Sequence, residues 1–333
     1  MNLIIPMAGK GKRMRPHTLF TPKPLIPVGG KPIVQRLVED IAKMVDEPID
    51  EIGFIIGDFG EEVENELIAI AENLGAKGKI YYQDIALGTG HAIYCAEPSL
   101  NGPVIVAFAD TLFRADFRID ASQDGMIWVK QIEDPSQFGV VKVNDRGVIT
   151  DFVEKPKDFV SDLAIIGIYF FKDGKHLKRE LKYLMDNNVV KGGEFQLTDA
   201  LENMKKQGIT FRPGTVDHWM DCGNKNATVE TNKMLLEFNK EVNMVSEKAN
   251  VKNSTLIQPV LIADGAMVEN SVIGPHVSIG ADASIKDSRI SNSIIRTNAQ
   301  IQNAVIDNSL IGTNTSIKRS ALDVSLGDFS TLI

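Results

Sequence analysis

Residues 3–16 read LIIPMAGKGKRMRP. The apolar run Leu3–Pro6 predicts a short buried strand, and a loop with two glycines and four basic side chains follows it directly. Glycine lets backbone N–H groups converge on an anion, and four cations suit a triphosphate. The stretch therefore predicts a phosphate-binding loop after the first strand of an α/β domain. A solvated basic turn is the alternative that the spacing alone leaves open.

Two better-known phosphate motifs do not fit this loop. The dinucleotide-binding fingerprint requires a third glycine where Met14 stands, and the P-loop requires Gly-Lys-Ser/Thr after four intervening residues. Pro22-Lys23-Pro24 follows a few residues later. Its two prolines reduce the entropy that the lysine loses on binding an anion.

Strand and helix patterns alternate through the next hundred residues. Ile52–Ile56 and Val104–Ala107 predict buried strands, and the second ends just before Asp110. The apolar spacing of Glu61–Leu74 predicts an amphipathic helix between them. Strands separated by helices predict a mostly parallel sheet that is covered on both faces.

Two further elements complete this first domain. Val140–Glu154 predicts a hairpin with its turn at residues 144–147, which read Asn-Asp-Arg-Gly. Lys225–Lys240 predicts a helix that closes the domain. We therefore expect a first domain at residues 1–240 and a second at residues 250–333.

The second domain follows a different pattern. Branched aliphatic residues recur in it at spacings of five and six, with small or polar residues between them. They are Val251, Ile257, Ile262, Val268, Ile273, Ile279, Ile285, Ile290, Ile295, Ile301, Ile306, Ile311, Ile317 and Leu322. A period near six predicts one apolar side chain per side of a triangular coil, and hence a parallel β-helix of about four turns. A set of short antiparallel strands is the alternative.

Composition excludes several functional classes. A net charge of −8 and a pI near 5.3 argue against binding to nucleic acid or to an anionic membrane surface. Two cysteines, Cys95 and Cys222, are too few for a disulfide framework and indicate a reducing compartment. The apolar run at residues 3–8 is too short for a signal peptide or a membrane span. We expect a cytoplasmic protein.

Six motifs in order resemble the sugar-1-phosphate nucleotidylyltransferases. They lie at residues 9–32, 87–92, 138–141, 153–156, 193–199 and 219–223, and the resemblance covers roughly residues 1–235. Several members of that family also carry a C-terminal left-handed β-helix. The resemblance thus implies a Rossmann-like mixed sheet in a nucleotidyltransferase domain, followed by a short left-handed parallel β-helix built from hexapeptide repeats.

The resemblance also implies roles for individual residues, which we divide by ligand. Gly9, Gly11 and Arg13 would bind the triphosphate, and Arg13 would also stabilise the leaving pyrophosphate. Lys23 would contact the reacting phosphates. The base would be bound by Gln83, Gly88 and Thr89. The sugar 1-phosphate would be bound by Gly139, by Glu154 at a hydroxyl and by Lys155 at the phosphate. Mg²⁺ would be held by Asp110 and Asp221. Arg13, Lys23 and Lys155 would be the catalytic cations.

Three positions depart from the family pattern. Ala109 replaces the glycine that usually precedes the metal-binding aspartate, and Thr111 replaces the usual small or amide residue after it. Ile166 stands where many members have a threonine or asparagine that touches the sugar. His91, which begins a predicted helix, is interpreted as a structural residue rather than a catalyst.

The implied reaction is attack by a sugar-phosphate oxygen on the α-phosphorus of UTP or dTTP, with release of pyrophosphate. The sugar would be glucose 1-phosphate or N-acetylglucosamine 1-phosphate. Two other functions compete with this one. Hexapeptide-repeat acyltransferases also use such coils with a nearby histidine, for which the coils offer only His276. A regulatory subunit would bind nucleotide-sugars without turnover. Because β-helix coils leave exposed ends or faces, we also expect a homo-oligomer.

Overall fold

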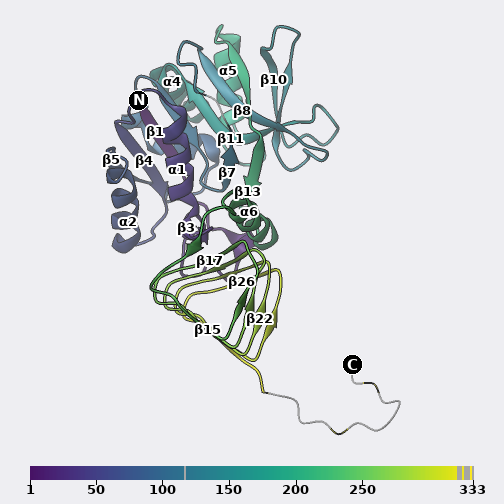
Figure 1. Ribbon diagram of the computed structural model, residues 1–333. Helices are drawn as coiled ribbons and strands as arrows, with labels where there is room; N and C mark the ends of the chain where they lie inside the picture. The colour runs from purple at the N-terminus through teal and green to yellow at the C-terminus, as the bar shows by residue number, and fades with distance from the viewer. Residues whose placement is uncertain (116–117, 321–324, 326–330, 332–333) are drawn as a thin grey trace. The chain divides into compact units, whose positions relative to one another are not determined.

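The computed structural model describes residues 1–115, 118–320, 325 and 331, and Figure 1 shows its two compact units. Unit 1 comprises Met1–Ile26 and Pro32–Gly223, and unit 2 comprises Pro27–Lys31 and Asn224–Ile333. Among the described residues, no helix has the length and hydropathy needed to cross a bilayer.

Unit 1 is built on a mixed sheet. Its path runs β10 (Ile149–Glu154), β9 (Gly139–Val143), β11 (Leu163–Phe171), β6 (Val104–Ala107), β1 (Asn2–Pro6), β4 (Glu51–Ile56) and β5 (Lys77–Tyr82). The four strands from β6 to β5 are parallel, whereas β11 runs antiparallel to β6. Two more strands, β8 (Gly125–Gln131) and β12 (Phe211–Thr215), extend the sheet beside β11. The expected Rossmann-like mixed sheet is confirmed.

Helices cover both faces of this sheet. The helices of unit 1 are α1 (Ile33–Met44), α2 (Glu61–Glu72), α3 (Thr89–Cys95), α4 (Gly174–Asp186) and α5 (Leu197–Lys206). Short 3₁₀ turns are η1 (Lys12–Met14), η2 (Lys23–Leu25) and η3 (Glu97–Ser99). Helix α2 packs so closely on β5 that a Cβ on Gly78 would lie 2.8 Å from the Cα of Ile68. The glycine therefore lets this helix approach its strand.

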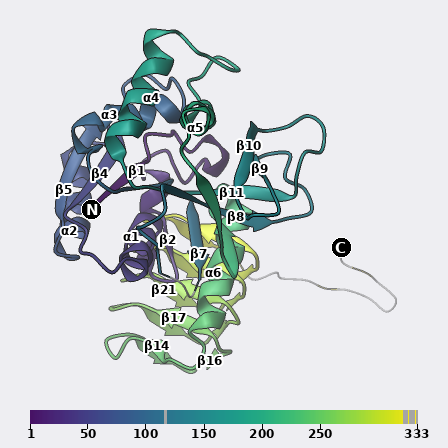
Figure 2. The ribbon, with the colours of Figure 1, turned by 90° about the horizontal axis from the view of Figure 1, so that it is seen from above.

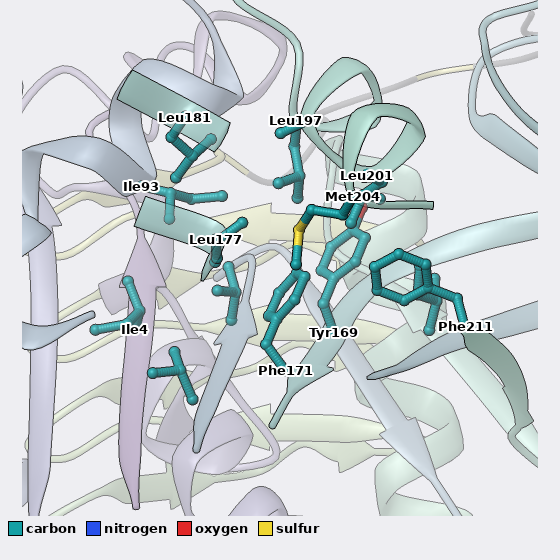
Figure 3. Close-up of a cluster of buried hydrophobic side chains, with 14 of the residues drawn as sticks. Ile4, Ile93, Tyr169, Phe171, Leu177, Leu181, Leu197, Leu201, Met204 and Phe211 are labelled. Atoms are coloured by element: carbon teal, nitrogen blue, oxygen red, sulfur yellow. The ribbon is translucent and has the colours of Figure 1, made fainter. Parts of the chain in front are cut away.

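The opposite face of the sheet carries the main core of unit 1. Ile4 points from β1 into a cluster with Leu177, Leu181 and Leu201 from α4 and α5 (Figure 3). Val106, its partner on the neighbouring strand, belongs to the same cluster. Helices α3 and α4 pack side by side over this face (Figure 2). Burial of so many aliphatic side chains holds the carboxyl ends of β1 and β6 in place, since each contributes about 1.5–3 kcal/mol.

Unit 2 contains a parallel β-helix with triangular coils (Figure 1). The first side stacks β14 (Met244–Val245), β17 (Val260–Ile262), β20 (Val277–Ile279), β23 (Ser293–Ile295) and β26 (Ser309–Ile311). The second side stacks β15 (Asn250–Lys252), β18 (Met267–Glu269), β21 (Ser284–Lys286), β24 (Gln300–Gln302) and β27 (Ser316–Lys318). The third side stacks β16 (Thr255–Leu256), β19 (Val272–Ile273), β22 (Arg289–Ile290) and β25 (Val305–Ile306). The parallel pairing confirms the β-helix and excludes the antiparallel alternative.

The described coils number four complete turns and two sides of a fifth, close to the expected count. Their corners use asparagine or aspartate in the left-handed region, as at Asn253, Asn270 and Asp287, where φ is +47°, +50° and +50°. Among residues with a Cβ, these two pay least for this conformation because their short polar side chains bond locally. Asn270 Nδ2 donates to Asp287 Oδ1 at 3.1 Å, which links corners of successive coils.

Two residues of the predicted inward series are not seen to point into the coils. Ile257 is 41% exposed, and the expectation that it points inward is wrong, because Leu256 pairs in register with Ile273 and packs against the coil interior instead. The strands of the third side have only two residues each, so a repeat of five or six residues does not determine which of the two points inward. Leu322 lies outside the described residues.

The boundary between the units falls earlier than the sequence pattern indicates. Helix α6 (Lys225–Phe238), expected to close the first domain, belongs to unit 2 and packs against β20, β23 and β26. Buried Asn232 on α6 accepts hydrogen bonds at its Oδ1 from Ser278 Oγ at 2.7 Å and from Gly29 N at 2.8 Å. Gly29 joins the short strands β2 (Pro27–Val28) and β3 (Lys31–Pro32). These contacts are long-range, so local periodicity does not reveal them.

Candidate active site

Two aspartates meet at the carboxyl edge of the parallel strands of unit 1. Asp110 follows β6, and the antiparallel pairing of β7 (Thr111–Arg114) with β13 (His218–Asp221) sets Asp221 opposite Thr111. Cys222 N donates to Asp110 O at 2.9 Å and so extends this pairing by one residue. The strand register therefore brings together two acidic side chains that are far apart in the sequence.

Both aspartates lie among cations. Lys23 Nζ is 2.7 Å from Asp110 Oδ2. Burial raises the pKa of Asp221, and the neighbouring charge of Asp110 raises it further, while a hydrogen bond from Gly223 N and the charges of Lys23 and Arg13 lower it. The electrostatic coupling of the two carboxylates shows that they share one site, whose like charges are unfavourable without a cation nearby.

The donor set of this site fits a hard divalent cation. No group of three or more His, Cys, Asp or Glu side chains stands ready to hold a metal within the described part of the chain. Two carboxylates are sufficient for Mg²⁺, which commonly takes one or two carboxylates and completes its shell with water and substrate phosphates. Asp110 and Asp221 are the residues that would hold it.

A cavity of ≈ 280 Å³ opens on one side of Asp110. Its polar lining includes Gly9, Lys23, Gln83 and Thr89, and its apolar lining includes Phe108. A Cβ on Gly9 would meet no protein atom within 4 Å, so packing does not require glycine there. The missing side chain leaves room for a ligand to approach the backbone.

The glycine-rich loop takes its shape from Gly11. This residue has φ +55° and precedes η1, and a Cβ on it would lie 2.9 Å from Thr18 Cγ2. Thr18 Oγ1 donates to Gly11 O at 2.9 Å, which ties the two ends of the loop together. Gly11 is absent from the lining of the cavities described here, so its effect on a ligand would act through the loop backbone.

The loop before α3 borders the same cavity. Gly88 has φ +111°, and a Cβ there would lie 2.5 Å from Phe195 O. Phe195 N donates to Leu87 O at 2.8 Å, and Leu197 N donates to Thr89 Oγ1 at 3.0 Å. These contacts leave space only for glycine at position 88. They also fix the positions of Gly88 and Thr89, which line the first cavity with Gln83.

A second cavity of ≈ 550 Å³ lies on the other side of Asp110. Thr89, Phe108 and Asp110 line both cavities. The remainder of the second lining includes the predicted residues Arg13, Gly139, Glu154, Lys155 and Asp221, together with Ile166, Tyr169 and Trp219. Two ligands, one in each cavity, would therefore approach each other at Asp110.

Comparison with known proteins identifies the family of this chain. Residues 3–237 match the family model described as nucleotidyl transferase. The chain belongs to the nucleotidyl transferase family. Residues 256–324 match a second model, described as GMPPB C-terminal domain. These matches, with the relatives below, make the chain an enzyme of the sugar-1-phosphate nucleotidylyltransferase class.

Three relatives illustrate the family. The glucose-1-phosphate thymidylyltransferase of Streptomyces griseus is 27% identical over 322 residues, covering 90% of this chain and 88% of the relative. The bifunctional protein GlmU of Methanocaldococcus jannaschii is 30% identical over 269 residues, covering 80% of this chain and 61% of the relative. A crystal structure of UDP-glucose pyrophosphorylase with UDP-glucose has a TM-score of 0.59 at 25% identity, covering 71% of this chain and 98% of that one.

In this nucleotidyl transferase, Glu154 and Lys155 stand at the end of β10. Burial raises the pKa of Glu154, and the charge of Lys155 opposes that rise. The Lys155 side chain is 63% exposed, with Nζ 3.8 Å from Glu154 Oε1. Lys155 has φ +41° although it precedes Pro156, a position that normally favours extended backbone. A strained backbone of this kind is typical of functional positions.

The structure brings most of the predicted residues together and adds several. Arg13 lines the second cavity beside Asp221 rather than the first, and Gly11 shapes its loop from outside both. Sequence reasoning assigned no role to Glu194 in the first cavity or to Tyr169 in the second. Glu194 lies in a recognised motif at residues 193–199, which was the one available signal. Tyr169 lies in an apolar strand and offers no local signal.

Proposed function

We propose that this chain transfers a uridylyl or thymidylyl group from UTP or dTTP to glucose 1-phosphate or N-acetylglucosamine 1-phosphate, releasing pyrophosphate. The supporting observation is that the two cavities meet at Asp110. A nucleotide in the first cavity and a sugar 1-phosphate in the second bring their phosphates to the same place. Holding two reactants in this way supplies much of the rate enhancement of a two-substrate reaction.

In the proposed mechanism, an oxygen of the sugar phosphate attacks the α-phosphorus in line with the departing pyrophosphate. Such an oxygen is already ionised at pH 7, so the reaction needs no general base. The main obstacle is repulsion between two anions, which Arg13, Lys23 and Lys155 reduce. Mg²⁺, when bound by Asp110 and Asp221, would neutralise charge on the phosphates.

Lys23 changes partner in this scheme. Its ammonium contacts Asp110 Oδ2 at 2.7 Å. Binding of a triphosphate and its cation at Asp110 would release Lys23 to contact the phosphates. The 3₁₀ turn η2 and its flanking prolines hold the lysine backbone in place during this exchange.

The base is assigned to uracil or thymine. Gln83 and the Gly88–Thr89 segment line the first cavity, and uracil and thymine present the same hydrogen-bonding edge. A site with matched polar groups rejects a different edge strongly, whereas one methyl group changes discrimination by about 1–3 kcal/mol. The sugar is assigned less narrowly, because buried Ile166 lines the second cavity in place of a polar residue.

We expect UTP and dTTP to be accepted, UTP to be preferred, and CTP, ATP and GTP to be poor substrates. The measurement is pyrophosphate release from a grid of these five triphosphates against glucose 1-phosphate, N-acetylglucosamine 1-phosphate and mannose 1-phosphate. Highest activity with GTP or ATP would contradict the base assignment and leave the reaction class intact. No pyrophosphate from any pair would favour the regulatory-subunit alternative.

Acyl transfer by the coils receives no support from the geometry. The ring nitrogens of His276 both lie near oxygens, Nε2 at 2.6 Å from Glu237 Oε1 and Nδ1 at 3.2 Å from Asn292 Oδ1. A histidine acting as general base requires one nitrogen that can reach the substrate. Acyl-CoA turnover by the purified chain would overturn this interpretation.

We also propose that the protein forms homo-oligomers through unit 2 and works in the cytoplasm. The oligomer is supported by Met267 and Val305 on the coils, whose side chains are 49% and 80% exposed. The compartment is supported by the two cysteines, which are free thiols. Light scattering should give a mass of at least two chains of 36.6 kDa each, and Val305→Glu should lower it. Tyr183→Glu, at an exposed position of unit 1, is the control. A monomeric wild-type chain would contradict the proposal.

A further inference from the structure

The side-chain amide of Gln83 has two close neighbours on one side. Gln83 follows β5, and its backbone N donates to Ile56 O at 2.8 Å, which anchors the residue beside the first cavity. Its Nε2 lies 3.2 Å from Gly88 O and 3.0 Å from His91 Nδ1. Both neighbours come from the start of α3, where Gly90 N donates to Phe195 O at 2.8 Å.

These contacts determine which end of the amide faces α3. A backbone carbonyl only accepts hydrogen bonds, so the NH₂ group of Gln83 must face Gly88 O. That nitrogen has two hydrogens and no acceptor, so His91 Nδ1 must accept the second hydrogen. His91 is then neutral, with its proton on Nε2. Burial lowers the pKa of His91, which favours this neutral form at pH 7.

We propose that His91 is a positioning residue that determines base specificity by holding the amide of Gln83. The inference rests on the proposed function, and it adds a role to a residue that lies outside the lining of both cavities. Both hydrogens of the amide are engaged with α3, so Oε1 is the atom left for the base. A free acceptor there pairs with a base that presents a ring N–H.

The proposal accounts for discrimination between pyrimidines. Uracil and thymine carry a hydrogen on N3, which Oε1 of Gln83 can accept, whereas N3 of cytosine is itself an acceptor. Two acceptors facing each other repel and leave a buried polar group unpaired. Rotation of the amide by a half turn would reverse this preference. His91 therefore acts on specificity by preventing that rotation, since Gly88 O alone holds only one of the two hydrogens.

The test compares kcat/KM for UTP and for CTP, each with glucose 1-phosphate as acceptor. His91→Ala and His91→Phe both remove the acceptor, and the phenylalanine keeps the ring volume. We expect each to reduce the UTP-to-CTP ratio about tenfold, the effect of one hydrogen bond worth ~1.4 kcal/mol. His91→Asn offers an oxygen in place of Nδ1 and should restore most of the ratio.

Cys95→Ala is the matched control. Its Sγ lies 3.9 Å from the same Nδ1 of His91, one helical turn further along α3. This variant should leave the ratio unchanged. A merely structural role for His91 would lower both kcat/KM values together at a constant ratio, and that result would overturn the proposal.

The two proposals fail in different ways. Wild-type protein that releases no pyrophosphate with either UTP or dTTP would contradict the proposed function. Calorimetric binding of UDP and of CDP, which needs no turnover, would still test the role of His91. A UDP-to-CDP affinity ratio that is the same in wild type, His91→Ala and His91→Phe would overturn the inference by itself.

Discussion

Asp110→Asn should lower kcat by at least ~10²-fold, the loss expected when a main charge stabiliser of the transition state is removed. The change keeps the size of the side chain and removes its charge. It also leaves Lys23 without the carboxylate that it contacts at 2.7 Å. The measurement is steady-state pyrophosphate release with UTP and glucose 1-phosphate. Addition of EDTA to the wild-type enzyme should abolish the same activity, and excess Mg²⁺ should restore it.

Two controls sharpen this experiment. Asp145→Asn makes the same chemical change at an exposed turn between β9 and β10 and should retain full activity. Thermal unfolding of each variant should show whether the fold is kept, since Asp110 O accepts its hydrogen bond from Cys222 through the backbone and not the side chain. Wild-type kcat in Asp110→Asn would end the assignment of this residue to the reaction.

Lys155→Ala should reduce kcat/KM for the sugar 1-phosphate by about 10–10²-fold and change the KM for UTP much less. An ammonium on the phosphate makes a charge-assisted hydrogen bond, which is stronger than a neutral one. The effect should fall mainly on one substrate because Lys155 lines the second cavity and not the first. The measurement is initial rate with each substrate varied in turn at saturation of the other.

A second variant at Lys155 separates the effect of its charge from the effect of its backbone conformation. Its φ of +41° is unfavourable for any residue with a Cβ and is easily adopted by glycine. Lys155→Gly therefore removes the charge and relieves the strain, whereas Lys155→Ala removes the charge alone. Equal losses in both would assign the effect to the ammonium. Exposed Lys157→Ala is the control, and an unchanged sugar-phosphate kcat/KM in Lys155→Ala would show that this charge is dispensable.

Local patterns in the sequence predicted much of the fold. Buried strands such as β6 and the hairpin of β9 and β10 have periodicities that depend only on neighbouring residues. The β-helix was predictable for the same reason, because each coil repeats one inward aliphatic residue per side. On the third side of the β-helix, where the strand has two residues, the sequence pattern predicted Ile257 as the inward residue instead of Leu256. The order of the motifs then predicted the family, which the comparisons confirmed.

Tertiary structure alone decided how the site is assembled. The register of β13 on β7 sets Asp221 beside Asp110, and α6, which the sequence pattern assigns to the first domain, belongs with the coils of unit 2. No local pattern shows which oxygen or nitrogen of the Gln83 amide faces α3. That choice follows from Gly88 O and His91 Nδ1. Strand register and hydrogen-bond direction depend on partners that folding brings together, so periodicity along the chain carries no information about them.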